Sequence, residues 1–393
     1  MTPTLGLDLT PLAGPLTTLQ RLEADLAARF LERDDAVRTL LVAVLAQQHV
    51  AVLGPPGTAK SLLVERLAAR ITTPGSPTQP FVWLLTRFTT PDELFGPISV
   101  VGLKRDEYRR ITRHKLPEAR FAFLDEIFKA NSAILNALLA LLNERVFDNG
   151  PTRLPVPLVT CVGAANELPQ GDELAALWDR FALRFMVGYV SEAAFPRLLR
   201  LAALATPPVT ISATALTSLH QAVPQVAIPD PIIAALAQLR TELAGKHIVA
   251  SDRRWRQSLD LLRAHALLEG RGQVEEDDLT ILREALWQTP EQRSEIGRHV
   301  ARLAHPLIAR AVELSDQALS IHEATMAAQR EPHQDDQAKM QAAVEGATRL
   351  KTVATQLNRL VEQAQSQGQK TDRLMRMHTQ VQTLRQQIAE LVL

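Results

Sequence analysis

The sequence predicts an α/β fold with a parallel sheet, followed by an all-α region and a C-terminal α-helical hairpin. Up to about residue 190, short apolar runs alternate with segments of helical spacing, which is typical of a parallel sheet with helices on both faces. Helical spacing alone continues to about residue 288, and heptad spacing follows in the tail. We therefore expect three domains, over residues 1–190, 191–290 and 291–393.

The helices and strands of the first region follow from apolar spacing and from the positions of Gly and Pro. The expected helices cover residues 16–47, 60–71, 131–142 and 172–180. The expected strands cover residues 49–53, 81–85, 121–124, 158–164 and 183–189. Residues 72–80, rich in Pro, Thr and Ser, are expected to form a surface connection. After about residue 191 no further strand is expected.

The tail contains two heptad blocks, over residues 340–364 and 374–391, whose registers differ by one residue. A turn within residues 366–372, which include Gly368, would reconcile them as an antiparallel pair. A preceding helix over residues 291–329 would be a third member. An intramolecular hairpin is the favoured interpretation, and an intermolecular coiled coil is the alternative.

The bulk composition is that of a globular chain without an excess of either charge. Of its 393 residues, 46% are hydrophobic and 22% charged, and 43 Lys and Arg balance 43 Asp and Glu. This balance argues against a broad surface for nucleic acid. The single Cys161 excludes a disulfide framework and favours a reducing compartment. Without a basic leader or an uninterrupted apolar span, the chain is expected to be cytoplasmic, with no membrane span.

A phosphate-binding loop is predicted between the strand at 49–53 and the helix at 60–71. The octet GPPGTAKS has glycines that turn backbone N–H groups toward phosphate, a lysine for the β and γ phosphates, and a serine for Mg²⁺. Alanine replaces the usual glycine before the lysine; we expect it to be tolerated because it accepts helical dihedrals. The candidate nucleotide-binding residues are Gly54, Pro55, Pro56, Gly57, Thr58, Ala59, Lys60 and Ser61.

Two acids follow the apolar strand at 121–124. Asp125 is predicted to act with Ser61 at the magnesium ion, and Glu126 beside the attacking water. Asn166 follows the strand at 158–164 and is predicted to orient that water. Each motif also has a purely structural interpretation. The glycine loop could be a strand-to-helix turn, the two acids could stand at a helix N-terminus, and Asn166 could cap a helix. The order of all three motifs favours a site for ATP and Mg²⁺.

These motifs resemble the MoxR family of AAA+ ATPases, specifically its regulatory ATPase variant A branch. The resemblance covers residues 22–287 and does not extend to the tail. The segments that carry it, in chain order, are GPPGTAKS, TRFTTPDELFGPISV, FLDEIFKANSAILNALLALLNERVFDNG, AANELP, WDRF and SDRRW.

The resemblance implies an AAA+ core with a helical lid, assembled as a homo-oligomeric ring, commonly a hexamer, with ATP between subunits. It places Asn166 at the sensor 1 position and Arg180 at the arginine finger, with Arg184 as a competitor. It places Arg253 or the adjacent Arg254 at the sensor 2 position of the lid. From spacing alone, each arginine would be interpreted as a solvated or ion-paired residue.

The function that the resemblance implies is a chaperone-like or remodelling motor that hydrolyses ATP. Its partner would be a protein with a von Willebrand factor A (VWA) domain, and the insert around residues 87–100 would engage substrate or be purely structural. One rival hypothesis is a nucleic-acid motor or loader. A second is a nucleotide-gated scaffold that recruits partners through its helical tail.

Overall fold

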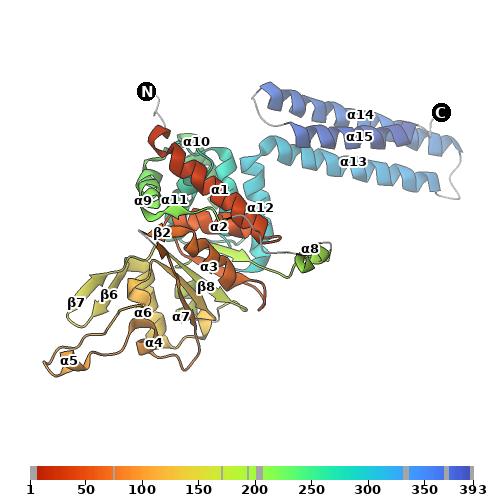
Figure 1. Ribbon diagram of the computed structural model, residues 1–393. Helices are drawn as coiled ribbons and strands as arrows, with labels where there is room; N and C mark the ends of the chain where they lie inside the picture. The colour runs from red at the N-terminus through yellow and green to blue at the C-terminus, as the bar shows by residue number, and fades with distance from the viewer. Residues whose placement is uncertain are drawn as a thin grey trace. The chain divides into compact units, whose positions relative to one another are not determined.

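The computed structural model describes residues 7–73, 76–169, 171–192, 194–200, 207–330, 336–366 and 371–389. The chain divides into two compact units, Met1–Gly297 and Arg298–Leu393 (Figure 1). The three domains expected from the sequence remain a prediction within this division.

A five-stranded parallel sheet lies at the centre of the first unit, in the order β4-β5-β8-β1-β9. Its strands are β1 (Val50–Leu53), β4 (Phe81–Leu84), β5 (Phe121–Asp125), β8 (Thr160–Ala165) and β9 (Leu183–Met186). Strand β8 lies between β1 and β5. Because parallel strands end at the same edge, the carboxyl ends of these three strands meet, which is where open α/β sheets bind ligands. The predicted parallel sheet is confirmed.

Two helices, not one, occupy the segment expected as a single helix over residues 16–47. They are α1 (Ala13–Arg29), preceded by η1 (Thr10–Leu12), and α2 (Asp34–Leu45). The break includes Glu32 at φ 56°, and the Glu32 carboxylate accepts hydrogen bonds from Ser191 N and Oγ. The sequence did contain a signal for this break. Two aspartates stand at the start of the second helix, and acids are favourable at a helix N-terminus.

Helices cover this sheet: α2 contacts β9, and α3 (Lys60–Ala69) contacts β5. The insert and the segments that follow β5, β8 and β9 contain further elements. These are α4 (Pro91–Phe95), α5 (Val100–Leu103), η2 (Leu116–Glu118), η3 (Ile127–Lys129), α6 (Ser132–Glu144), the hairpin β6 (Val146–Asn149) and β7 (Thr152–Pro155), α7 (Asp172–Trp178) and α8 (Phe195–Leu199). In Figure 1, α4, α5 and this hairpin lie together at the end of the core away from α1.

A small second sheet corrects two expectations. The connection at 72–80 contains β2 (Ile71–Thr73) and β3 (Ser76–Pro77), and β2 pairs with β10 (Ile211–Ser212) beyond the last expected strand. Strands of two or three residues leave too little alternation to be recognised in sequence. The region after β10 is helical as expected: α9 (Ala213–Ala222), η4 (Val223–Gln225), α10 (Asp230–Ala244), α11 (Asp252–Leu268), η5 (Glu276–Glu284) and α12 (Pro290–Ala304).

The second unit is a bundle of α13 (Pro306–Arg330), α14 (Asp336–Ser366) and α15 (Asp372–Ala389), which contact one another (Figure 1). Leu314, Leu350, Leu357 and Val381 belong to its buried core. The intramolecular hairpin with a third helix is confirmed, although residues 367–370 of the expected turn lie outside the described residues. The helix expected over 291–329 is divided before Pro306, a residue unfavourable in a helix interior. In the described part of the chain, every helix is too short or too polar to span a bilayer.

Candidate functional site

The GPPGTAKS loop joins β1 to α3, as the sequence predicted. A Cβ on Gly54 would come within 2.1 Å of Val187 O, so only glycine fits there. Gly57 has φ 78°, a left-handed conformation that glycine adopts without steric cost. Pro55 and Pro56 lie between them, and Ser61 is half-buried in the first turn of α3. The loop therefore leads backbone N–H groups to a helix N-terminus, an arrangement that suits phosphate.

Lys60 folds back over this loop. Its Nζ donates to Gly54 O at 2.7 Å and to Pro55 O at 2.9 Å. Burial lowers the pKa of Lys60, while the charges of Asp125 and Glu126 raise it. Since only β8 separates β1 from β5, the loop that carries Lys60 and the two carboxylates lie at the same edge of the sheet, as one nucleotide–magnesium site requires.

Ala59 lies in the left-handed region, with φ 65° and ψ 26°. The expected reason for its tolerance was therefore wrong, because the position does not use right-handed helical dihedrals. A left-handed conformation costs a residue with a Cβ roughly 1–2 kcal/mol. The loop thus keeps the backbone shape of the usual glycine at the expense of some strain.

Replacing Ala59 by glycine should increase the free energy of unfolding by up to about 1 kcal/mol, since relief of strain outweighs the added entropy of the unfolded chain. Urea unfolding measures this difference. Ala234, exposed in the middle of α10, is the matched control, and Ala234→Gly should lose about 1 kcal/mol instead. An equal loss in both variants would mean that Ala59 is not left-handed in solution.

The acidic pair lies at the end of β5, beside Asn166 at the end of β8. Glu126 is left-handed at φ 52°, and its N–H donates to Asp125 Oδ1 at 3.0 Å. Asn166 Nδ2 donates to Glu126 Oε1 at 2.8 Å, while Lys129 Nζ lies 3.3 Å from Glu126 Oε2. Strained backbone of this kind concentrates at functional sites. Lys129 was not expected, although its position three residues after the glutamate was a signal.

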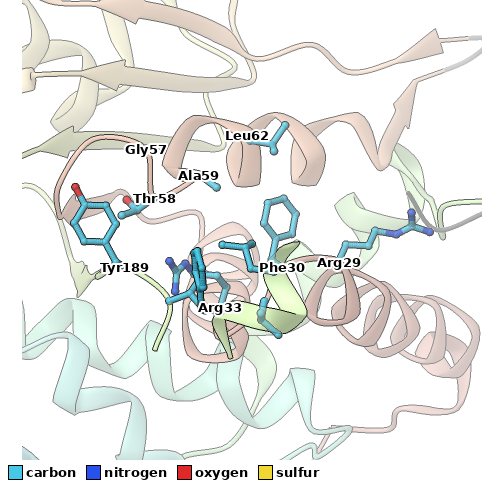
Figure 2. A pocket seen from close by; sticks show the side chains of 12 residues that line it. Arg29, Phe30, Arg33, Gly57, Thr58, Ala59, Leu62 and Tyr189 are labelled. Atoms are coloured by element: carbon cyan, nitrogen blue, oxygen red, sulfur yellow. The ribbon is translucent and has the colours of Figure 1, made fainter. Parts of the chain in front are cut away.

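A cavity of about 410 Å³ adjoins the phosphate loop, and apart from Gly57, Thr58 and Ala59 its lining residues were not predicted from the sequence. Figure 2 shows Gly57, Thr58 and Ala59 on one side, with Phe30 and Tyr189 among the other lining residues. The remaining lining residues are Arg29, Leu31, Arg33, Leu62, Val190, Phe195 and Leu198. The α1–α2 turn supplies one wall, so the error that merged these helices also hid the cavity.

Of the four candidate arginines, Arg184 and Arg254 are buried. Arg184 is 0% exposed and donates to Trp287 O, Gln288 Oε1 and Trp178 O. Burial lowers the pKa of Arg184, and the charge of Arg254 lowers it further. Arg254 is 1% exposed, and its pKa is lowered to about 10, chiefly by burial. Neither guanidinium is exposed to a nucleotide in this arrangement, and the choice within each pair of arginines stays a prediction.

The other two arginines remain accessible. Arg180 is half-buried in the turn after α7, and its buried Nε has no hydrogen-bond partner among the described residues. Arg253 is exposed in the first turn of α11. Within each pair that the resemblance offered, the geometry therefore favours Arg180 and Arg253.

Residues 17–219, just over half of the chain, match a family model described as the MoxR domain in the MoxR-vWA-beta-propeller ternary systems. The chain belongs to the MoxR family of AAA+ ATPases. Residues 231–300 of this MoxR-family protein match an AAA lid domain. The AAA+ core and helical lid that the resemblance implied are confirmed. The regulatory ATPase variant A branch stays a prediction.

Individual relatives agree with this assignment. An uncharacterized protein of Methanocaldococcus jannaschii is 42% identical over 271 residues, which are 68% of this chain and 70% of that protein. Chaperone MoxR1 of Mycobacterium tuberculosis is 29% identical over 189 residues, 46% of this chain and 47% of its own. The crystal structure of a putative ATPase from Cytophaga hutchinsonii has a TM-score of 0.59, covers 74% of this chain and 96% of its own, and shares the fold at 17% identity.

Proposed function

We propose that this MoxR-family protein hydrolyses ATP to ADP and phosphate in a Mg²⁺-dependent reaction. The observation that carries the proposal is that the ends of β1, β8 and β5, which precede or carry Lys60, Asn166 and the acidic pair, meet at one edge of the sheet. The loop fits a triphosphate because the two carbonyl contacts of Lys60 are ones that phosphate oxygens would replace. The adjoining apolar cavity has a suitable volume for the nucleoside.

Each polar group has one role in this proposal. Lys60 would bind the β and γ phosphates, and Ser61 and Asp125 would hold a magnesium ion, whose charge would offset that of the phosphates. Glu126 accepts the proton of the attacking water. Asn166 and Lys129 hold the two oxygens of Glu126.

Completion of the site by a second subunit follows from the resemblance. We place Arg180 at the γ-phosphate of a neighbouring subunit in a homo-oligomeric ring, commonly a hexamer in this family. Within the described part of the chain, the buried Arg180 Nε has no hydrogen-bond partner, which supports a group that is completed by another subunit. Arg253 would contact the nucleotide from the lid of its own subunit.

The process that hydrolysis drives is chaperone-like remodelling of a protein target with a VWA-domain partner. The description of the matched domain, which names MoxR-vWA-beta-propeller systems, supports this partner, and the name of the mycobacterial chaperone supports the activity. The insert presents exposed apolar side chains at Val100, Val101 and Leu103, suited to contact with an unfolded segment. We expect the protein to act in the cytoplasm.

Two measurements test this function against its rivals. ATP turnover should rise with a VWA-domain protein encoded in the same genome, and should not respond to single- or double-stranded DNA. Strong stimulation by DNA would favour a nucleic-acid motor instead. A purified preparation that binds ATP but releases no phosphate, alone or with that partner, would favour a nucleotide-gated scaffold.

A further inference from the structure

A buried polar contact joins the lid to the turn that carries Arg180. We call residues 178–182 the finger loop; it begins at the last residue of α7 and precedes β9. Its backbone is a tight turn, in which Arg180 N donates to Leu177 O at 3.0 Å and Phe181 N to Trp178 O at 3.3 Å. The finger loop thus has a defined shape whose carbonyl groups remain available to other partners.

Arg254, on lid helix α11, donates hydrogen bonds to carbonyl groups on both sides of Arg180. It donates to Phe181 O at 3.1 Å, Ala182 O at 3.2 Å and Asp179 O at 3.4 Å. It also forms a 3.3 Å ion pair with the Asp179 carboxylate. Ser251, which caps α11 by accepting from Arg254 N, donates to the same carboxylate. The start of this helix is therefore fastened to the finger loop.

Arg184 fastens the beginning of the finger loop to the segment after η5. Its guanidinium stacks on the Trp178 ring, 4.3 Å from the centroid, and donates to Trp178 O at 2.9 Å. The same guanidinium donates to Trp287 O and to Gln288 Oε1. Trp178 and Trp287 pack edge to face with centroids 5.6 Å apart. Two buried arginines thus link the finger loop to the lid region.

This contact leaves several buried donors unsatisfied. Of the eight buried side-chain polar atoms that lack a partner among the described residues, four lie here: Arg180 Nε, Arg184 Nε, Arg254 Nε and Trp287 Nε1. Buried donors are nearly always paired in native proteins, so such a concentration needs an explanation. A contact with more than one arrangement, in which different donors are satisfied, provides one.

We propose that Arg254 is a positioning residue for the arginine finger, holding the carbonyl groups around Arg180 so that its orientation follows the position of the lid. The proposal rests on the proposed function, in which Arg180 acts on the nucleotide of a neighbouring subunit. Arg253, the proposed nucleotide contact, directly precedes Arg254 on α11. A shift of this helix on nucleotide binding therefore moves the finger loop that the subunit presents to its neighbour.

Mixed assemblies separate this role from a contact with the subunit's own nucleotide. Donor subunits carry Glu126→Gln, so they lack the base but keep the finger. Acceptor subunits carry Arg180→Ala, so they lack the finger but keep the base. Neither should hydrolyse ATP alone, whereas a mixture should regain turnover at sites where a donor faces an acceptor. Failure of this parent mixture would count against the proposed finger in trans, before Arg254 is changed.

Arg254→Met is then added to one kind of subunit at a time. In the donor it should reduce the regained turnover about 10–100-fold, as expected for misplacement of a catalytic group, although the donor hydrolyses nothing itself. In the acceptor it should leave the regained turnover unchanged. Loss in the acceptor alone would make Arg254 a nucleotide contact, and equal loss in both or in neither would equally overturn the proposal.

Two further variants distinguish a loss of positioning from a loss of folding. Arg254→Lys keeps the charge but cannot bridge several carbonyl groups. It should therefore show the same loss of regained turnover when placed in the donor, while the temperature at which the subunit unfolds stays equal to that of the parent. Arg256→Met changes an exposed arginine two residues along α11 and should have no effect in either kind of subunit. A donor-specific loss with Arg256→Met, or none with a folded Arg254→Lys, would contradict the positioning role.

Discussion

Glu126→Gln should reduce steady-state phosphate release by about 10²–10⁴-fold, the contribution expected of a general base, while ATP binding is retained. The amide cannot accept the water proton, but its shape still permits the hydrogen bond to Asn166. Phosphate release and the affinity for a fluorescent ATP analogue, measured on the same preparation, check both parts of the prediction.

The matched control is Glu65→Gln, which changes an exposed glutamate on α3. Its turnover should equal that of the parent protein. Parental turnover in Glu126→Gln would refute the assigned base. Loss of ATP binding in that variant would show that Glu126 serves the shape of the site and not the proton transfer.

Arg180→Ala should reduce turnover about 10³–10⁵-fold, the range observed when an arginine finger is removed. The guanidinium would stabilise charge that appears on the transferred phosphoryl group, and Arg184, the competing candidate for the finger, cannot replace it because it is buried. Single-turnover hydrolysis separates this effect from slow product release.

Arg180→Lys is the informative companion variant, because lysine keeps the charge but lacks the planar fork. Its turnover should lie between that of the parent protein and that of the alanine variant. ATP affinity should change little in either variant, since the finger belongs to the neighbour's site. Near-parental turnover in Arg180→Ala would exclude it as the finger.

The catalytic groups were predictable because they are local to strand ends. A strand, a glycine turn and a lysine are contiguous in sequence, and so are the apolar run and the acids at 125 and 126. Their convergence also required that β8 lie between β1 and β5; alternation with helices predicts that the strands are parallel, but it does not predict this order. The hydrogen bond from Asn166 to Glu126 is the direct result of this topology.

The features that sequence did not predict depend on contacts between distant segments. Glu32 adopts its left-handed turn while accepting bonds from Ser191, 159 residues away, and no Pro or Gly marks that position. Arg253 and Arg254 cannot be distinguished in the sequence, yet the side chain of Arg254 is 1% exposed and that of Arg253 is exposed. Helical phase distinguishes them only once the packing partner is known.

The contact between Gly54 and Val187 O links the two ends of the nucleotide site. The Val187 N–H donates to Leu53 O at 2.8 Å, so the strand that precedes the phosphate loop and the chain that leads to Tyr189 are held in register there. A side chain at position 54 would push that chain outward. Such a variant should displace Tyr189 and change the shape of the cavity proposed for the nucleoside, even though the altered residue lies in the phosphate loop.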